Sequence, residues 1–345
     1  PGPVSIFMPP CPARALTDKD ARMETSRKLE SAPVEPATPA ALDDSPRSRA
    51  QRLARHFGWA GPIERKRDTI DWARNTPFLL MQVAPLAIFF VGFSWIALAV
   101  AFLFWFVRMF AITGFYHRYF SHKSFKTSRA MQAVMAFWGG LAVQKGALWW
   151  AAHHRDHHRY SDQDEDIHSP VRHGFLWSHI GWVLSRLGKP TNFDRVKELA
   201  RYPELRFLNK HHWIPTLTGA VGMFLLGKGL EGWAPGLGTN GWQMLVWGFF
   251  VSTFVLYHTT YSINSLTHVF GTRRYQTSDD SRNHWLFALI TLGEGWHNNH
   301  HQFPSTARMG FFWYEFDITW YGLWVMEKLG LIWDVRPIPD HARPD

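Results

Sequence analysis

Nine histidines and one asparagine lie in four short groups whose spacing suits metal binding. One ion takes roughly three or four protein ligands, so nine imidazoles are too many for one ion and about enough for two. Imidazole suits iron, zinc, copper and nickel, so the residues predict a two-metal site and leave the metal open. The groups are His117 and His122 in "HRYFSH", His154, His157 and His158 in "HRDHH", Asn264 and His268 in "NSLTH", and His297, His300 and His301 in "HNNHH".

Spacing within the groups indicates which side chains share a helix face. The second and fourth groups follow i, i+3, i+4, and Asn264 and His268 follow i, i+4, so each set is expected on one face. His117 and His122 are five residues apart and diverge on an ideal α-helix, so we expect them to serve two different points.

Other histidines and acids nearby have plainer explanations. Any one group alone is also explained by a charged loop, and only the four together favour metal. The acidic run is either a solvated turn or a set of acceptors that orient imidazole N–H groups, and Glu294 is not assigned as a ligand. Four histidines near the second group lack ligand spacing: His153, His168, His173 and His179. His258 is expected to be packed, and surface or interfacial positions are expected for His56, His211, His212, His284 and His341. The acids of the run are Asp162, Asp164 and Asp166.

Apolar segments surround these groups. Residues 78–107 carry no charge, and Arg108 is the first to interrupt them. A bilayer crossing takes about 20 apolar residues, so we expect four spans in two hairpins, at about residues 78–95, 97–115, 213–230 and 242–263. A buried core helix of a soluble protein is the alternative, but such helices seldom stay uncharged for so long. Residues 130–150 are expected to be interfacial or buried, not a fifth span.

Charge and composition set the orientation and the domain limits. Lys and Arg lie before the first span, between the second and third, and after the fourth, which places both termini and segments 116–210 and 264–335 in the cytoplasm. That topology explains the net charge of +9 without a nucleic-acid partner. The single cysteine, Cys11, excludes disulfides and cysteine metal sites. The predicted divisions are a disordered tail (1–46), a basic juxtamembrane segment (47–75), a membrane domain (76–335) and a C-terminal tail (336–345).

The sequence resembles the membrane-bound acyl-CoA desaturases of the stearoyl-CoA Δ9 type, and in particular their bacterial members. The likeness runs over about residues 76–335 and includes "FSHKSFKTSRAMQ", "GALWWAAHHRDHHRYSDQDEDIHSP", "GFLWSHIGW" and "GEGWHNNHHQFPSTAR". It implies an all-α integral membrane protein of the bacterial inner membrane, with four transmembrane helices in two hairpins and a cytosolic helical cap that carries a di-iron site. It assigns the nine histidines as iron ligands and Asn264 as a ligand through water.

The resemblance also implies the reaction. A methylene C–H has no acidity for a base to use, so the chemistry calls for two irons, O₂ as co-substrate and two electrons from a separate ferredoxin-, rubredoxin- or cytochrome-type protein and its reductase. The substrate is a fatty acyl-CoA or a lipid-bound acyl chain, and the product carries a cis double bond at Δ9. The chain departs from the animal enzymes at Ala152 and His153. Arg186 and Lys189 in "VLSRLGKP" are the candidate contacts to a CoA headgroup.

Two other functions remain open from the sequence. A histidine-box hydroxylase of fatty acids or alkanes shares the metal chemistry, and its product is an alcohol in place of an alkene. A non-catalytic membrane protein that binds or transports metal needs polar residues within its spans, whereas here the groups lie beyond the span ends.

Overall fold

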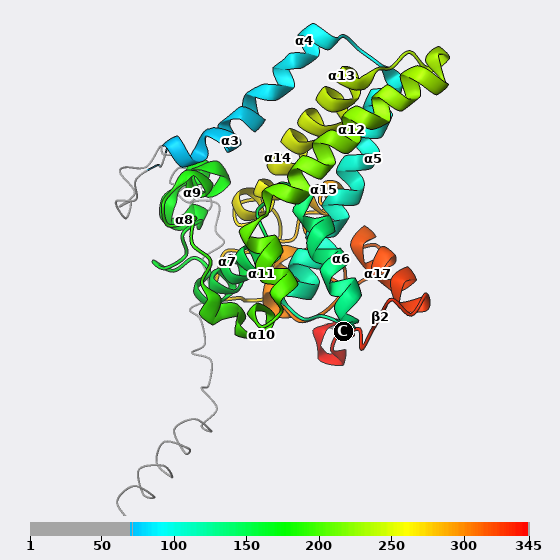
Figure 1. Cartoon of the computed structure of the whole chain (residues 1–345). Coiled ribbons are helices and arrows are strands. Elements are labelled where there is room, and N and C mark those ends of the chain that lie inside the picture. Colours follow the sequence, from blue (N-terminus) through cyan, green and yellow to red (C-terminus); the bar gives the residue numbers. More distant parts are fainter. Residues whose placement is uncertain (1–69, 71, 344–345) are drawn as a thin grey trace, which may run out of the picture. The chain divides into compact units, whose positions relative to one another are not determined.

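The computed structural model describes residue 70 and residues 72–343, and all of these described residues belong to one compact unit (Figure 1). The expected N-terminal tail and nearly all of the basic juxtamembrane segment lie outside the described residues. The described part is almost entirely helical. Its only strands are the two-residue β1 (Lys126–Thr127) and β2 (Ile332–Trp333), which pair antiparallel.

Two helices are long and apolar enough to cross a bilayer, Trp72–Val91 with 20 residues and Trp95–Ser121 with 27. The first consists of α3 (Trp72–Val83), η1 (Ala84–Ala87) and α4 (Ile88–Val91), and the second of α5 (Trp95–Phe110) and the π-helix η2 (Ala111–Ser121). Gly92, at a φ of +72°, ends the first, and the Ser94 side chain caps the second by accepting from the Ala97 N–H. They correspond to the first two predicted spans, with outer ends that differ by several residues.

The second pair of predicted spans is also helical. It consists of α12 (Trp213–Trp233), then η5 (Pro235–Leu237), α13 (Gly241–Gln243), the π-helix η6 (Met244–Val251) and α14 (Ser252–Leu266). Glycine, threonine and Lys228 dilute the apolar residues of α12, and hydroxyl side chains do so along α14. Among the described helices, only the first pair is both long enough and apolar enough to cross a membrane. That the second pair crosses a membrane therefore stays a prediction.

Helices α5, α12, η6 and α14 pack side by side (Figure 1). Arg108 of α5 is fully buried among them. Its guanidinium donates to Thr253 Oγ1 at 2.8 Å, Ser252 Oγ at 2.6 Å and the Leu141 carbonyl at 3.1 Å. Arg108 is thus satisfied by neighbouring helices and neither faces lipid nor extends to the interface, which removes most of the cost of a charge at this depth.

The remaining helices form a cap at one end of these four. Residues 130–150 run through α6 (Arg129–Gly140) and into α7 (Ala147–Tyr160), and both helices pack on η2. Met135, Ala136 and Leu148 are buried there, in agreement with the buried alternative for this segment; that it is not a fifth span stays a prediction. The other cap elements are α8 (Pro170–His173), η3 (Trp177–Gly181), α9 (Trp182–Leu184), η4 (Phe193–Val196), α10 (Lys197–Ala200), α11 (Pro203–Lys210), α15 (Trp285–Ile290), α16 (His297–Gln302), α17 (Ile318–Lys328) and η7 (Asp340–Ala342).

The C-terminal residues are tied to the cap. The Arg336 N–H donates to the Ser124 carbonyl at 2.8 Å, and the Arg336 carbonyl accepts from Ala307 at 3.1 Å. The Tyr275 hydroxyl donates to the Ala342 carbonyl. Segments far apart in the sequence are therefore joined beside the fourth histidine group.

Candidate metal centre

The fold gathers the nine predicted histidines into two groups. In each group the candidate ligand atoms all lie within 4.8 Å of one another. The first group contains His117, His122, His154, His158 and His300, and the second contains His157, His268, His297 and His301. The prediction that four sequence groups meet at one place agrees with this geometry, and their role as ligands is taken up below as a proposal.

His117 and His122 join the same group, so the expectation that they serve two different points was wrong. The reason is the backbone, which forms a π-helix over Ala111–Ser121. In a π-helix the hydrogen bonds run i to i+5, and residues five apart share a face. The His122 N–H accordingly donates to the His117 carbonyl at 3.2 Å.

Helices α7 and α16 each supply both groups. In α7, His154 and His158 reach the first group and His157 the second; in α16, His300 reaches the first and His297 and His301 the second. Residues at i and i+4 lie on one side of an α-helix, and the remaining residue is rotated by about one residue step from one of them. Each of these two helices therefore lies beside both histidine groups and contributes side chains to each.

Distances within the groups fit a shared ion. The Nε2 atoms of His122 and His154 are 2.8 Å apart, and those of His158 and His300 are also 2.8 Å apart. A protein imidazole nitrogen binds a divalent ion such as zinc at about 2.0–2.1 Å, which puts neighbouring ligand atoms roughly 3 Å apart. A hydrogen bond can join only one pair of facing nitrogens at a time, whereas an ion can hold all of them.

Unpartnered nitrogens point the same way. His157 Nε2 and His301 Nε2 are buried, and no hydrogen-bond partner for either lies among the described residues. A buried polar atom left unsatisfied costs about 1–3 kcal/mol. Both atoms belong to the second group, where a metal ion would satisfy them. Together with the close Nε2 pairs of the first group, they show that the residues present fit a two-metal centre.

Carboxylates fix the outer nitrogens of the second group. Asp162 Oδ2 lies 3.0 Å from His268 Nδ1, Asp166 Oδ2 lies 3.0 Å from His157 Nδ1, and Asp279 Oδ2 lies 2.5 Å from His301 Nδ1. Each such contact leaves Nε2 to face the centre. Of the two readings of the acidic run, Asp162 and Asp166 are therefore acceptors, whereas Asp164 is exposed on a turn.

In the first group, Glu294 pairs with His117 Nδ1. Glu294 also accepts from Arg118 at 3.3 Å, and Arg118 donates to Asp317 at 2.9 Å, all of them buried. Glu294 thus orients an imidazole, in agreement with its not being assigned as a ligand. Asp279 and Asp317 were missed, because no spacing in the sequence relates them to the histidines.

Burial sets the protonation of the histidines. Burial, followed by the charge of neighbouring imidazoles, lowers the pKa well below its ordinary value in His122, His154, His158, His297 and His300. Neutral imidazole is the form that binds metal. Burial would also lower the pKa of His268, but the Asp162 carboxylate outweighs it and raises that pKa to about 9.

Two glycines shape the turn that leads into α16. Gly293 has a φ of +122°, a conformation that L side chains rarely adopt. A Cβ on Gly295 would lie 2.0 Å from the Ala288 backbone nitrogen. Both positions exclude larger residues, and together they hold His297 at the centre.

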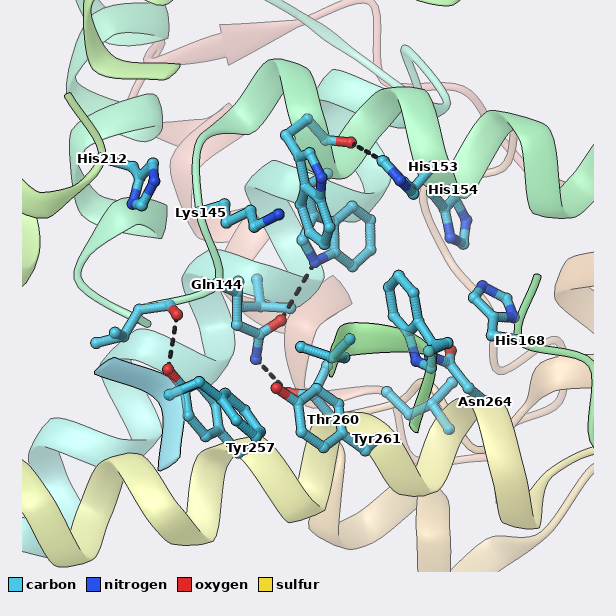
Figure 2. A pocket seen from close by; sticks show the side chains of 18 of the residues that line it. Gln144, Lys145, His153, His154, His168, His212, Tyr257, Thr260, Tyr261 and Asn264 are labelled. Carbon is cyan, nitrogen blue, oxygen red and sulfur yellow. Dashed lines mark hydrogen bonds between the residues drawn. The ribbon is translucent and has the colours of Figure 1, made fainter. Parts of the chain in front are cut away.

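A cavity of about 480 Å³ leads to both histidine groups. His117, His154 and His297 line it, and Figure 2 shows His154 on the same side of it as His153 and His168. Aromatic and apolar residues of α3, α7 and α14 form much of its wall, including Phe78, Trp149, Trp150, Tyr257 and Tyr261. A cavity whose wall is largely aromatic and apolar suits a hydrocarbon chain.

Gln144 lies in the cavity wall and joins Thr260 of α14 to Trp150 of α7 through hydrogen bonds. Its Nε2 donates to Thr260 Oγ1 at 3.0 Å and its Oε1 accepts from Trp150 Nε1 at 3.2 Å (Figure 2). The Val143 carbonyl accepts from the Tyr257 hydroxyl at 2.8 Å. The bend between α6 and α7 is thereby fastened to α14, and Val143 and Lys145 in it both have a φ of +61°. The sequence offered only one signal for this bend, a lysine within an apolar segment.

Of the three other predicted site residues, two line the cavity and one does not. Asn264 lines the cavity, as His297 of the second histidine group does. Lys189 also lines the cavity, and its Nζ donates to the Val183 carbonyl at 3.1 Å. Arg186 is exposed and does not line the cavity, so as a contact to the cavity's ligand it is not supported.

Among the histidines set aside, His168 and His153 lie closer to the centre than their spacing indicates. Both line the cavity, and His168 Nδ1 lies 3.1 Å from Asp166 Oδ1. His168 forms a third cluster with His157 and Asp166. His258 is packed as expected, with its Nδ1 3.0 Å from His179 Nε2 and its Nε2 3.1 Å from Gln82 Oε1.

The family model "Fatty acid desaturase" matches residues 93–326, which hold all nine histidines. The chain belongs to the fatty acid desaturase family. The desaturase is 37% identical over 270 residues to an sn-1 stearoyl-lipid 9-desaturase of Anabaena variabilis, covering 77% of this chain and 94% of the relative. It is 35% identical over 326 residues to Delta-9 acyl-lipid desaturase 2 of Arabidopsis thaliana (92% and 96%), and 33% identical over 316 residues to an icosanoyl-CoA 5-desaturase of Limnanthes douglasii (89% and 83%).

These relatives confirm that the protein is an oxidoreductase that desaturates fatty acyl chains at a membrane. Their names include both lipid-bound and CoA-bound substrates, so the resemblance to acyl-CoA enzymes in particular is not established. The double-bond position, the carrier, the source of electrons and the bacterial origin are likewise beyond what the family alone decides.

Proposed function

We propose that the desaturase inserts a cis double bond at the Δ9 position of a lipid-bound fatty acyl chain. The names of the Anabaena and Arabidopsis relatives support both the position and the lipid carrier. The observation that carries the proposal is the cavity, whose apolar wall leads an acyl chain to His117, His154 and His297 and so to both histidine groups.

The two histidine groups are the proposed sites of two irons, with Asn264 completing one of them through water. When bound, the irons supply the reduction of O₂ that removes two hydrogens from the chain. The balance is –CH₂–CH₂– + O₂ + 2 e⁻ + 2 H⁺ → –CH=CH– + 2 H₂O. The electrons come from a separate ferredoxin-, rubredoxin- or cytochrome-type protein.

The protein's own part is to hold and position. The carboxylates of Asp162, Asp166 and Asp279 keep the outer imidazole protons in place and the inner nitrogens free. The cavity wall excludes water and fixes which methylene pair lies at the centre, and such positioning decides the product. Four membrane spans, with the cap and both termini in the cytoplasm, complete the proposed arrangement.

Expression in a desaturase-deficient host, followed by analysis of its fatty acids, tests this function. The intact protein is expected to yield a Δ9 alkene and to hold two irons per chain. His157→Ala is expected to abolish the product and lower the iron content, and His211→Ala, which is in neither group and does not line the cavity, to change neither. An alcohol product would identify a hydroxylase. An iron-free protein without activity would point to a binding role, and an unchanged product from His157→Ala would refute the centre.

A further inference from the structure

The C-terminal part of the cap exposes an apolar surface, which we call the apolar platform. Residues 285–293 carry no charge. Residues 309–326 contain two acids, Glu315 and Asp317, and both are fully buried. An exposed apolar surface without charges marks a site of interaction. The exposed side chains of the platform are Trp285, Leu286, Leu289 and Ile290 of α15, Trp313, Tyr314 and Phe316 of the following loop, and Tyr321, Trp324 and Val325 of α17.

Hydrogen bonds join the pieces of the platform. The Leu292 carbonyl, just after α15, accepts from the Thr319 N–H at 2.9 Å and from the Thr319 hydroxyl at 2.8 Å. Trp296 Nε1 donates to the Phe316 carbonyl at 2.8 Å. The platform is therefore one body, and its inner side holds the turn that leads to His297.

Helix α17 is apolar on both of its faces. Its inner face packs on η2, where a Cβ on Gly114 would lie 3.5 Å from Thr319 Cγ2 and 3.6 Å from Leu323 Cδ2. Its outer face carries the exposed side chains of the platform, and its first charged residue is Glu327, near its end. A helix that is apolar all round is either enclosed by protein or surrounded by lipid.

The contact between α17 and the second candidate span indicates the depth of the platform. The hydroxyls of Thr113 and Thr319 are 2.7 Å apart, and a Cβ on Gly322 would overlap the Phe110 ring. At about 1.5 Å of rise per residue, Phe110 lies roughly 22 Å along the helix from Trp95, and Thr113 roughly 27 Å. An exposed tryptophan such as Trp95 is typical of a membrane boundary. The hydrocarbon core of a bilayer is about 30 Å thick, so α17 packs where that core ends on the side of the cap.

The apolar surface of the span reaches α17 without an exposed charge. The charged residues of the helix Trp95–Ser121 are Arg108 and Arg118, and both are fully buried. Phe102 and Leu103 on the same helix are 63% and 59% exposed. Protein interfaces have a polar rim, whereas the platform adjoins a surface that is itself suited to lipid. This continuity favours lipid over a protein partner.

We propose that the apolar platform lies in the bilayer, at the boundary between headgroups and acyl chains in the leaflet on the side of the cap. Tryptophan favours this boundary, and the platform exposes Trp285, Trp313 and Trp324. The inference rests on the proposed spans and goes beyond the proposed function. It gives the cap its own attachment to the membrane, which holds the turn before His297 at a fixed level relative to the lipid.

Single fluorescent labels test this placement in the whole, iron-loaded chain in phosphatidylcholine nanodiscs. Cys11→Ser removes the single thiol of the sequence, and Val325→Cys or Trp313→Cys supplies one for a nitrobenzoxadiazole label. Quenching by a lipid that carries a nitroxide near its carboxyl end is compared with quenching by iodide in the water.

Two further label positions serve as references. Phe102→Cys reports on the exposed face of the second candidate span. Phe193→Cys is the matched control, because Phe193 is also an exposed aromatic residue of the cap but lies between the exposed polar residues Asn192 and Asp194.

The labels at Val325 and Trp313 are expected to behave like the label at Phe102. Their ratio of lipid quenching to iodide quenching should exceed that at Phe193 about fivefold or more, as for side chains that lie about 5–10 Å into the boundary. A ratio equal to that at Phe193 would overturn the inference, because it would place the platform in water. Protection from both quenchers would overturn it as well, because a second copy or another protein would then cover the platform.

The same samples separate this inference from the proposed function. Iron content and alkene product are measured on each labelled protein. If both are normal while the labels at Val325 and Trp313 behave like the label at Phe193, the proposed function stands and only this inference fails. Strong iodide quenching at Phe102 would refute the proposed spans, and the platform's place in the bilayer with them.

Discussion

His117 and His122 face one another across one turn of π-helix, with ring centroids 4.9 Å apart. An α-helix would rotate residues five apart well away from each other, and the wider turn brings them to one site. This π-helix, η2, continues directly from α5, and the two together make up the second candidate span. The membrane helix thus continues into the metal centre without a loop, and His117 is held as firmly as the span itself.

Asp162→Asn should weaken metal binding in the second histidine group. The Asp162 carboxylate lies 3.0 Å from His268 Nδ1 with one oxygen and accepts from the Ser169 hydroxyl at 2.6 Å with the other, whereas an amide has only one acceptor oxygen and no negative charge. Loss of such an outer partner typically costs about 10- to 100-fold in metal affinity. Competition with a chelator measures it. Asparagine tolerates the φ of +58° at this position, so misfolding is not the expected cause.

Asp164→Asn is the control for that measurement. Its side chain is 81% exposed, and among the described residues its one ion-pair partner is Arg172 at 3.5 Å. Metal retention should equal that of the unmodified protein. Equal losses in the two variants would mean that the acidic run acts through its overall charge and not through His268.

The identity of the nine histidines was predictable, and their division into two sites was not. The sequence shows the spacing i, i+3 and i+4 directly, and residues so spaced share one face of an α-helix, so His154, His157 and His158 could be placed together. The π-helix at His117 leaves no local sign in the sequence, because its hydrogen bonds depend on the packing of α6 and α7 against it. Asp279 was invisible for a similar reason: it reaches His301 only through the folded loop between α14 and α16.

For the predicted spans, too, local properties could be read from the sequence and contacts between distant segments could not. Residues 78–115 could be predicted from hydropathy alone, since the two helices are uncharged up to Arg108. What holds Arg108 could not, because Ser252 and Thr253 lie more than 140 positions away in the sequence. The cavity has the same origin, since its wall combines residues of α3, α7 and α14.

Gly295→Ala should destabilise the protein and lower its iron content. The added Cβ would lie 2.0 Å from the Ala288 nitrogen, a backbone atom that cannot move aside. Overpacking of this kind costs about 1–3 kcal/mol. Thermal unfolding and iron analysis measure both effects. Gly222→Ala, where nothing lies within 4 Å of the new Cβ, should leave both unchanged. A stable, fully loaded Gly295→Ala would show that the turn before α16 can relax.

Thr260→Val should loosen the position of the acyl chain. It removes the acceptor of the Gln144 amide and so frees the side chain that also holds Trp150. We expect a mixture of double-bond positions and a loss of about 1 kcal/mol in stability. Mass spectrometry of derivatised products measures the positions. Thr259→Val is the control, since that hydroxyl bonds within its own helix, to Val255 at 2.8 Å. A single product from both variants would exclude Gln144 as a positioning residue.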